Sequence, residues 1–189
     1  MSGERDITKF FDNVDHVVLR ACLHRKLTDV SVLKLLDKVV ASYSLQLEAS
    51  KQGLPIGNLT SQIFANIYLN EFDRYVRGVI KPLAYIRYGD DFLLFGKDKS
   101  KVLGYRTACA EWLYDELRLN VHKSNNKVIA VKTGVHFLGH QIYANNQVHV
   151  DGFMTNKMLK KVSPANIAVY KAMHITEAER KLLSWRLAP

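Results

Sequence analysis

The clearest pattern in this sequence is the recurrence of apolar residues at three- and four-residue spacing, which marks the buried stripe of an amphipathic helix. Leu19, Cys22, Leu23 and Leu27 show this spacing, and Asp15 before them is a suitable N-cap. Three further stretches show the same pattern, so we predict four helices, of which the first two pack as a pair. They are expected at about residues 15–27, 33–43, 63–78 and 102–113.

A second pattern predicts a β-hairpin with acidic residues at its tip. The apolar residues of 84–88 lead into Gly89, Asp90 and Asp91, and the apolar run 92–95 leads out again. Glycine and aspartate favour tight turns, so this pattern indicates strand, turn and strand. Shorter β segments are predicted at residues 4–8, 128–131, 135–138, 140–143 and 147–150.

The order of these elements predicts an α+β fold in which helices pack against an antiparallel sheet. We expect one main domain over residues 1–150. The tail over residues 151–189 differs from it, because it carries seven Lys and Arg against three Asp and Glu. Thr176 and Glu179 have the spacing of a capping box. We therefore expect a basic helical tail.

Composition narrows the class of protein. A chain of 189 residues with 48% hydrophobic content can bury a substantial core. The formal charge of +9 indicates an anionic partner, either nucleic acid or an acidic membrane surface. The apolar runs are too short to span a bilayer, and Asp6, Asp12 and Asp15 interrupt any signal peptide. We expect a cytoplasmic protein that does not use a membrane.

The cysteines and histidines do not indicate a site. Cys22 and Cys109 both lie in apolar helical patterns. We interpret them as small core residues in a reducing compartment. The seven histidines show no pairing at helical spacing, so no zinc site is predicted.

The unusual feature is the placement of carboxylates. Asp90 and Asp91 interrupt an apolar strand pair, where like charges repel and burial is unfavourable. Each could be an ordinary turn residue. Asp6 lies at the mouth of another short strand, and by itself it could be a strand-end or capping residue.

Together the three carboxylates suggest a metal site. If the strand that carries Asp6 lies beside the hairpin, Asp6, Asp90 and Asp91 converge, and divalent cations would neutralise the cluster. Mg²⁺ suits hard oxygen ligands that are completed by substrate phosphates, and Mn²⁺ is the alternative. This chemistry is that of two-metal phosphoryl transfer.

Five short segments, taken in order, resemble the motifs of reverse transcriptases. Each is weak alone, but agreement in order and spacing over about residues 4–143 is implausible by chance. The resemblance implies a polymerase palm that uses an RNA template, a DNA primer and dNTP, with residues 151–189 as the start of a thumb. The segments are Asp6-Ile7-x-x-Phe10-Phe11-Asp12 (motif A), Gly57-x-x-x-Ser61-Gln62 (motif B), Tyr88-Gly89-Asp90-Asp91 (motif C), Leu117-Arg118-Leu119-Asn120 with Lys123 (motif D) and Phe137-Leu138-Gly139-His140 (primer grip).

The resemblance also implies roles for single residues. Asp6 and Asp90 are expected to be the principal metal ligands, with Asp91 and the carbonyl of Ile7 completing the site. Lys123 is either a proton donor to the pyrophosphate or a solvated lysine before a turn. The residues expected to contact nucleotide, template or primer are Phe11 (a gate against the ribose 2′-hydroxyl), Ile56, Gly57, Gln62, Phe137, Leu138 and Gly139.

Two departures from the family pattern matter. Ile56 stands where retroviral and intron enzymes usually carry glutamine, a variant similar to diversity-generating retroelement and bacterial group II-like enzymes. Loss of the amide predicts reduced base selectivity. The sequence also begins five residues before Asp6, without the fingers strands that bind the triphosphate. We expect negligible polymerase activity from this chain alone, with missing fingers and thumb segments or an accessory protein as partners.

Two other functions stay open. A viral-type RNA-dependent RNA polymerase also carries Gly-Asp-Asp, but it usually has an aspartate where Phe11 stands, so Phe11 favours deoxynucleotides. A non-catalytic RNA-binding or maturase-like module would keep the fold and the charge. The retained acids Asp6 and Asp90 count against that alternative.

Overall fold

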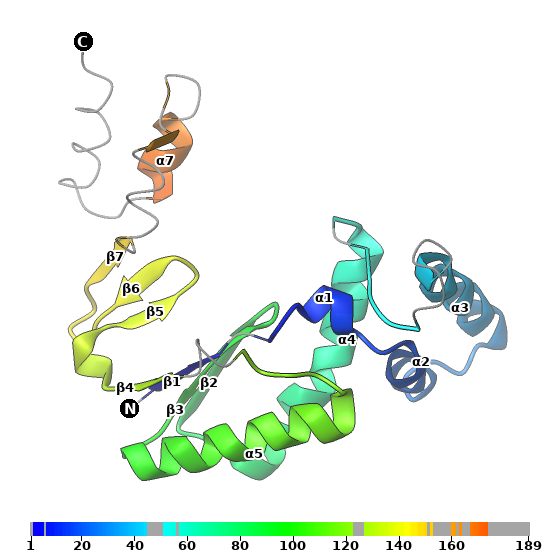
Figure 1. The fold of residues 1–189 in the computed structure, drawn as a ribbon, viewed down its shortest axis with the longest axis horizontal. Coiled ribbons are helices and arrows are strands. Elements are labelled where there is room, and N and C mark those ends of the chain that lie inside the picture. Colours follow the sequence, from blue (N-terminus) through cyan, green and yellow to red (C-terminus); the bar gives the residue numbers. More distant parts are fainter. Residues whose placement is uncertain are drawn as a thin grey trace. The chain divides into compact units, whose positions relative to one another are not determined.

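The fold is that of a computed structural model, which describes residues 2–5, 7–44, 51–55, 57–122, 127–150, 152, 160, 161, 163 and 167–173 (Figure 1). The chain divides into two compact units, Gly3–Val128 and Ile129–Pro189. The predicted helix after Thr176 lies outside the described residues. The predicted domain boundary after residue 150 stays a prediction.

The first unit is built on a four-stranded sheet of β1 (Ser2–Arg5), β2 (Ala84–Tyr88), β3 (Asp91–Phe95) and β4 (Lys127–Ile129). The strand order is β2-β3-β1-β4. β2 and β3 pair antiparallel, which confirms the predicted hairpin. β1 is a neighbour of β3, so a strand from the beginning of the chain lies directly beside that hairpin.

The four predicted helices of this unit are confirmed. A short helix that the hydrophobic pattern did not indicate precedes them. The third predicted helix, expected to end at about Gly78, ends in a π-helical turn that extends to Ile80. The helices are α1 (Phe10–Asn13), α2 (His16–His24), α3 (Val30–Ser44), α4 (Leu59–Tyr75) with its π turn η1 (Val76–Ile80), and α5 (Lys99–Leu117).

Local chemistry explains where α2 begins. The Asp15 carboxylate accepts hydrogen bonds from the backbone N–H groups of Val17 and Val18 at 2.8 and 3.1 Å. It therefore satisfies two amides that have no partner inside the helix. α2 packs against α3, as predicted, and also against α4. An ion pair between Arg20 and Asp37 at 3.0 Å joins α2 to α3.

The core lies between α4, α5 and the sheet. Phe72 on α4 meets Phe92 of β3 with ring centroids 4.9 Å apart, and both side chains are fully buried. Tyr75 stacks on Trp112 of α5 at 4.9 Å. Figure 1 shows α5 next to the β2–β3 hairpin and inclined to its strands, in keeping with its contacts to β3. Burial of these aromatic rings together with the aliphatic core residues stabilises the unit.

Neither cysteine forms a disulfide bond, and both are completely buried, as expected for core residues. Burial, the largest effect, raises the pKa of the Cys22 thiol. The thiol therefore stays protonated and contributes as a small apolar group.

The second unit holds a three-stranded antiparallel sheet of β5 (Val135–Phe137), β6 (His140–Ile142) and β7 (Val148–Val150), in that order. A 3-10 turn at Val131–Thr133 precedes it, and α7 (Ile167–Met173) follows. The predicted β segments are confirmed in this region. Within the described part of the chain, no helix has the length and apolarity to cross a membrane.

Candidate functional site

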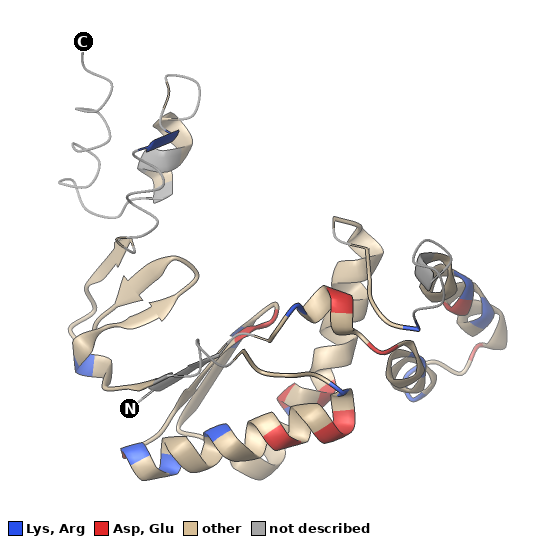
Figure 2. Cartoon of the chain, viewed as in Figure 1, with Lys and Arg blue, Asp and Glu red and all other residues tan. Residues whose placement is uncertain are grey.

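The β2–β3 hairpin presents the two motif C carboxylates at its tip. Tyr88 pairs with Asp91, which leaves Gly89 and Asp90 as the two residues of the turn. Gly89 has φ of +60°, a conformation that glycine adopts without steric cost. Asp90 and Asp91 are both half-buried, and Figure 2 shows the acidic tip of this hairpin.

The motif A segment continues directly from the strand that lies beside the hairpin. β1 ends at Arg5, and Asp6, the next residue, lies outside the described residues. Ile7 is buried and forms an antiparallel bridge with Val121, while the Thr8 N–H donates to the Asn120 carbonyl at 2.8 Å. Motif A is thus fixed between motifs C and D. β1 and β3 are adjacent, but β1 ends one residue before Asp6, so the predicted convergence of Asp6 with the hairpin carboxylates stays a prediction.

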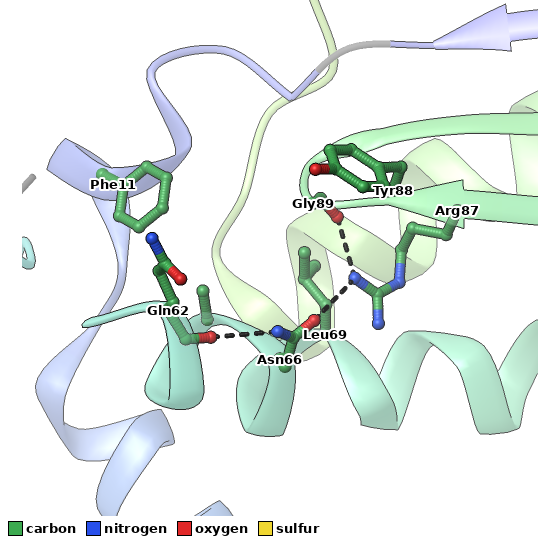
Figure 3. Close-up of a pocket in the computed structure, with 8 residues that line it drawn as sticks. Phe11, Gln62, Asn66, Leu69, Arg87, Tyr88 and Gly89 are labelled. Atoms are coloured by element: carbon green, nitrogen blue, oxygen red, sulfur yellow. Dashed lines mark hydrogen bonds between the residues drawn. The ribbon is translucent and has the colours of Figure 1, made fainter. Parts of the chain in front are cut away.

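A cavity of about 420 Å³ opens beside the hairpin turn. Two predicted nucleotide contacts, Phe11 from α1 and Gln62 from α4, line it together with Tyr88 and Gly89 of motif C. Figure 3 shows the Phe11 ring and the Gln62 amide near each other at one side and the hairpin turn at the other. Segments separated by about 80 residues in sequence therefore meet at one cavity. Its remaining lining residues are Ala65, Asn66, Leu69 and Arg87.

The position of Phe11 is set by its neighbours. Its ring is half-buried and meets Phe10 edge-on, with centroids 5.2 Å apart and planes at 74°. The Phe11 carbonyl accepts a hydrogen bond from the Leu54 N–H at 2.7 Å, and the Val14 carbonyl accepts one from Gly53 at 2.8 Å. These backbone hydrogen bonds therefore hold residues 53 and 54, which lead into motif B, against the motif A segment and α1.

Motif B begins with a glycine whose conformation few other residues tolerate. Gly57 has φ of +96°, and a Cβ at this position would meet no atom within 4 Å. The constraint is therefore on the backbone rather than on space. Ser61, in the first turn of α4, is buried, and its hydroxyl makes no hydrogen bond to any residue that the structure describes. Ile56 lies outside the described residues.

Motif D lies on the C-terminal side of α5. Leu119 is fully buried, and Arg118 forms an ion pair with Asp15 at 2.6 Å. Burial acts to raise the pKa of Asp15, but hydrogen bonds from Val18, Arg118 and Val17 outweigh it, so this pKa lies below its usual value. The carboxylate stays ionised and links the start of α2 to motif D. Lys123 lies outside the described residues.

The predicted primer-grip residues form the turn of the β5–β6 hairpin in the second unit. Phe137 pairs with His140, and Leu138 and Gly139 are the two turn residues, with φ of +51° and +76°. Positive φ at both central positions is typical of a type I′ hairpin turn. The His140 ring Nδ1 makes a 3.0 Å hydrogen bond with the Leu138 carbonyl.

The sequence argument missed an arginine at the centre of the first unit. Arg87 of β2 forms two parallel hydrogen bonds with Asp73 of α4, at 2.8 and 2.7 Å, and a third with the Gly89 carbonyl at 2.8 Å. Burial acts to raise the pKa of Asp73, but hydrogen bonds from Arg87 and Tyr85 hold it below its usual value. The sequence does contain a signal for this residue, because Arg87 is a charged residue within the otherwise apolar strand 84–88.

The chemistry of the donor set fits a divalent cation. Asp90 and Asp91 supply hard oxygen ligands at a partly exposed turn, as Mg²⁺ and Mn²⁺ prefer. No group of three or more potential metal ligands gathers within the described ranges, which exclude Asp6. The predicted three-carboxylate centre therefore stays a prediction.

Comparison with known proteins decides the family. Residues 4–142 match the profile of the family described as "Reverse transcriptase (RNA-dependent DNA polymerase)". The chain belongs to the reverse transcriptase family. This match extends over all five motifs and ends at the last residue of β6, so the resemblance seen in the motifs is confirmed at the level of the family.

Two individual proteins are also similar to this chain in sequence. Protein YkfC of Escherichia coli is 30% identical over 174 residues, covering 74% of this chain and 46% of YkfC. The group II intron-encoded protein LtrA of Lactococcus lactis is 37% identical over 76 residues, covering 39% of this chain and 13% of LtrA. The chain therefore corresponds to less than half the length of either relative.

The fold is also similar to that of a solved telomerase. The telomerase of Candida albicans, in a complex with a fragment of telomeric RNA, aligns with a TM-score of 0.57 at 13% identity. The alignment covers 98% of this chain and 39% of the telomerase chain. Such a likeness supports the α+β polymerase fold.

Proposed function

We propose that this chain is the palm portion of an RNA-directed DNA polymerase that joins a dNTP to a primer 3′-hydroxyl. The observation that carries the proposal is the cavity where Phe11, Gln62 and the Gly89 turn meet, next to the half-buried Asp90. The residues of motifs A and B that we propose to contact the nucleotide, Phe11 and Gln62, thus line the same cavity as the turn that carries Asp90. RNA template, DNA primer and dNTP are the proposed partners.

In this proposal Asp6, Asp90 and Asp91, with the Ile7 carbonyl, hold two divalent metal ions. Bound ions would activate the 3′-hydroxyl and neutralise charge on the triphosphate. Support comes from the strand order, because β1, which leads into Asp6, neighbours β3, which begins at Asp91. The bridge between Ile7 and Val121 holds the motif A backbone in that place.

The chain's own residues orient the substrates. Phe11 presents a half-buried ring to the cavity and, as proposed, excludes a ribose 2′-hydroxyl. Gln62 offers an exposed amide to the nucleotide or template, and Gly57 lets the backbone approach closely. Lys123 would give a proton to the pyrophosphate, and Phe137–Gly139 would hold the primer.

The test measures Mn²⁺ binding by loss of the free-ion EPR signal. We expect Asp6→Asn and Asp90→Asn each to weaken binding, because each removes a ligand charge. The matched control is Asp115→Asn, which removes an exposed carboxylate in the last turn of α5. This variant should bind Mn²⁺ as the parent does. Equal affinity in all four proteins would contradict the metal site and favour a non-catalytic RNA-binding module.

A second measurement addresses the nucleic acid. Fluorescence anisotropy with an RNA–DNA template-primer should show binding that weakens steeply as salt is raised, because a chain of net charge +9 would displace counterions from the phosphates. Binding that is absent, or that does not change between low and moderate salt, would contradict this partner.

A further inference from the structure

Arg87 donates hydrogen bonds both to α4 and to the turn of the β2–β3 hairpin. Its Nε and Nη2 bind the two carboxylate oxygens of Asp73 at 2.8 and 2.7 Å, and Nη1 binds the Gly89 carbonyl at 2.8 Å. Nη1 also lies 3.4 Å from the Asn66 amide oxygen. Figure 3 shows the guanidinium between α4 and the hairpin turn. The planar fork of arginine suits this arrangement, which a single ammonium cannot reproduce.

The Asp73 end of this link is a rigid anchor. The Asp73 and Arg87 side chains are only 16% and 11% exposed, so the pair is shielded from water. The Tyr85 hydroxyl donates a further hydrogen bond to Asp73 at 2.7 Å. Phe72, the preceding residue on α4, is fully buried in the aromatic core. A displacement of Asp73 would therefore disturb the packing of α4.

The Gly89 end is where such an anchor has an effect. The Gly89 carbonyl belongs to the planar peptide unit that joins Gly89 to Asp90, so fixing this oxygen restricts the backbone on which the Asp90 carboxylate is carried. Gly89 itself gives little restraint, because it has no side chain and nothing lies within 4 Å of where a Cβ would be. The contact from Arg87 supplies restraint that the turn residue lacks.

The same link reaches the nucleotide side of the cavity. Asn66, which accepts from Arg87, donates from Nδ2 to the Gln62 carbonyl at 3.1 Å. Asn66, Gln62, Arg87 and Gly89 all line the cavity. One chain of hydrogen bonds thus runs from the helix that carries Gln62 to the turn that carries Asp90.

We propose that Arg87 is a positioning residue, which uses Asp73 as its anchor to hold the Asp90 carboxylate in register with α4. This inference rests on the proposed function, because it assumes that Asp90 binds a metal ion. In this proposal Arg87 acts through the backbone that carries Asp90 and is not itself a metal ligand. Groups that orient metal ligands typically change metal affinity by 10- to 100-fold when they are mutated.

The deciding variant is Arg87→Lys. Lysine keeps the positive charge beside Asp73 but cannot bind both Asp73 oxygens and the Gly89 carbonyl together. We expect its Mn²⁺ dissociation constant, measured by EPR on the full chain, to rise about 10-fold. Arg20→Lys is the matched control, because Arg20 makes an ion pair with Asp37 at 3.0 Å on the α2–α3 side. This control should bind Mn²⁺ as the parent does.

The outcomes separate the inference from the proposed function. If Asp90→Asn leaves Mn²⁺ binding unchanged, the metal site is absent and both are overturned. If binding depends on Asp90 but Arg87→Lys binds as tightly as the parent, only the positioning role is overturned. Should Arg87→Lys lose its cooperative thermal transition, Asp73→Asn, which leaves Arg87 and one acceptor oxygen in place, serves instead. It should show a smaller loss of affinity, and an unchanged dissociation constant there would equally overturn the role.

Discussion

The Tyr68 hydroxyl donates a hydrogen bond to the Leu117 carbonyl at 2.7 Å, which ties α4 to the last residue of α5. The same oxygen accepts from the Asp15 N–H at 3.3 Å. Tyr68 is fully buried, and burial, the largest effect, raises the pKa of its phenol well above the usual value. The phenol is therefore a neutral donor and acceptor that connects three segments around the candidate site.

Removing this hydroxyl should destabilise the protein. Tyr68→Phe leaves the buried Leu117 carbonyl without its donor, so we expect a loss of about 1–3 kcal/mol in the free energy of unfolding. Urea denaturation followed by circular dichroism measures it. Tyr114→Phe, at a site 61% exposed on α5, is the control and should change little. Equal stability of both variants would show that water replaces the lost bond.

Glycine-to-alanine substitutions at two positions with space for a methyl group should change the free energy of unfolding in opposite directions. Gly57 and Gly104 both have space for a methyl group, but only Gly57 has a positive φ. Gly104→Ala, inside α5, should stabilise by about 1 kcal/mol because alanine is the better helix former. Gly57→Ala should destabilise by roughly 1–2 kcal/mol because an L side chain is strained there. Changes of the same sign in urea midpoints would contradict the assigned backbone of Gly57.

Stability should depend on pH through Asp73. Its folded pKa lies below the reference value of 3.8, so the folded state favours the ionised form. The resulting stabilisation is present above that reference value and is lost as the pH falls through the lower folded pKa. Asp73→Asn should therefore lose less stability than the parent between pH 6 and pH 3 in urea melts. Parallel pH dependence of the two proteins would contradict the role of the Arg87 pair.

Phe11 should control the choice of sugar if the proposed function holds. Phe11→Val shortens the side chain at the cavity, so a ribose 2′-hydroxyl would fit where the ring excluded it. We expect the ratio of dissociation constants for rNTP and dNTP, measured with fluorescent nucleotides and template-primer, to move towards unity. Phe95→Val, on β3 and outside the cavity lining, is a control of the same size change. An unchanged ratio in Phe11→Val would contradict the proposed role of Phe11 in excluding the ribose 2′-hydroxyl.

A change at Ile56 should alter base selectivity. The proposed loss of an amide at this position predicts that Ile56→Gln lowers misincorporation in primer extension by a polymerase that contains these residues. The added side chain can donate and accept hydrogen bonds near the nucleotide, which isoleucine cannot do. Equal misincorporation by the parent and Ile56→Gln would contradict the idea.

Local features of the sequence were sufficient for the four longer helices of the first unit, for the β2–β3 hairpin and for its turn. Asp15 begins α2 as expected, because an aspartate N-cap acts on amides two and three residues away. Gly89 and Asp90 form the tip of the hairpin, because the turn depends on the conformational freedom of the glycine itself. The family followed in the same way, from short motifs in a fixed order.

Only the tertiary structure decided which of these segments meet. Arg87 of β2 forms an ion pair with Asp73 of α4, and Arg118 forms one with Asp15, which lies 103 positions earlier in the sequence. Neither pair has a periodic signature, because ion-pair partners are selected by how helices and strands pack and not by their spacing along the chain. The sequence by itself determined the elements, the turns and the candidate carboxylates, whereas packing of α4 against the sheet brought Gln62, Arg87 and the Gly89 turn to one cavity.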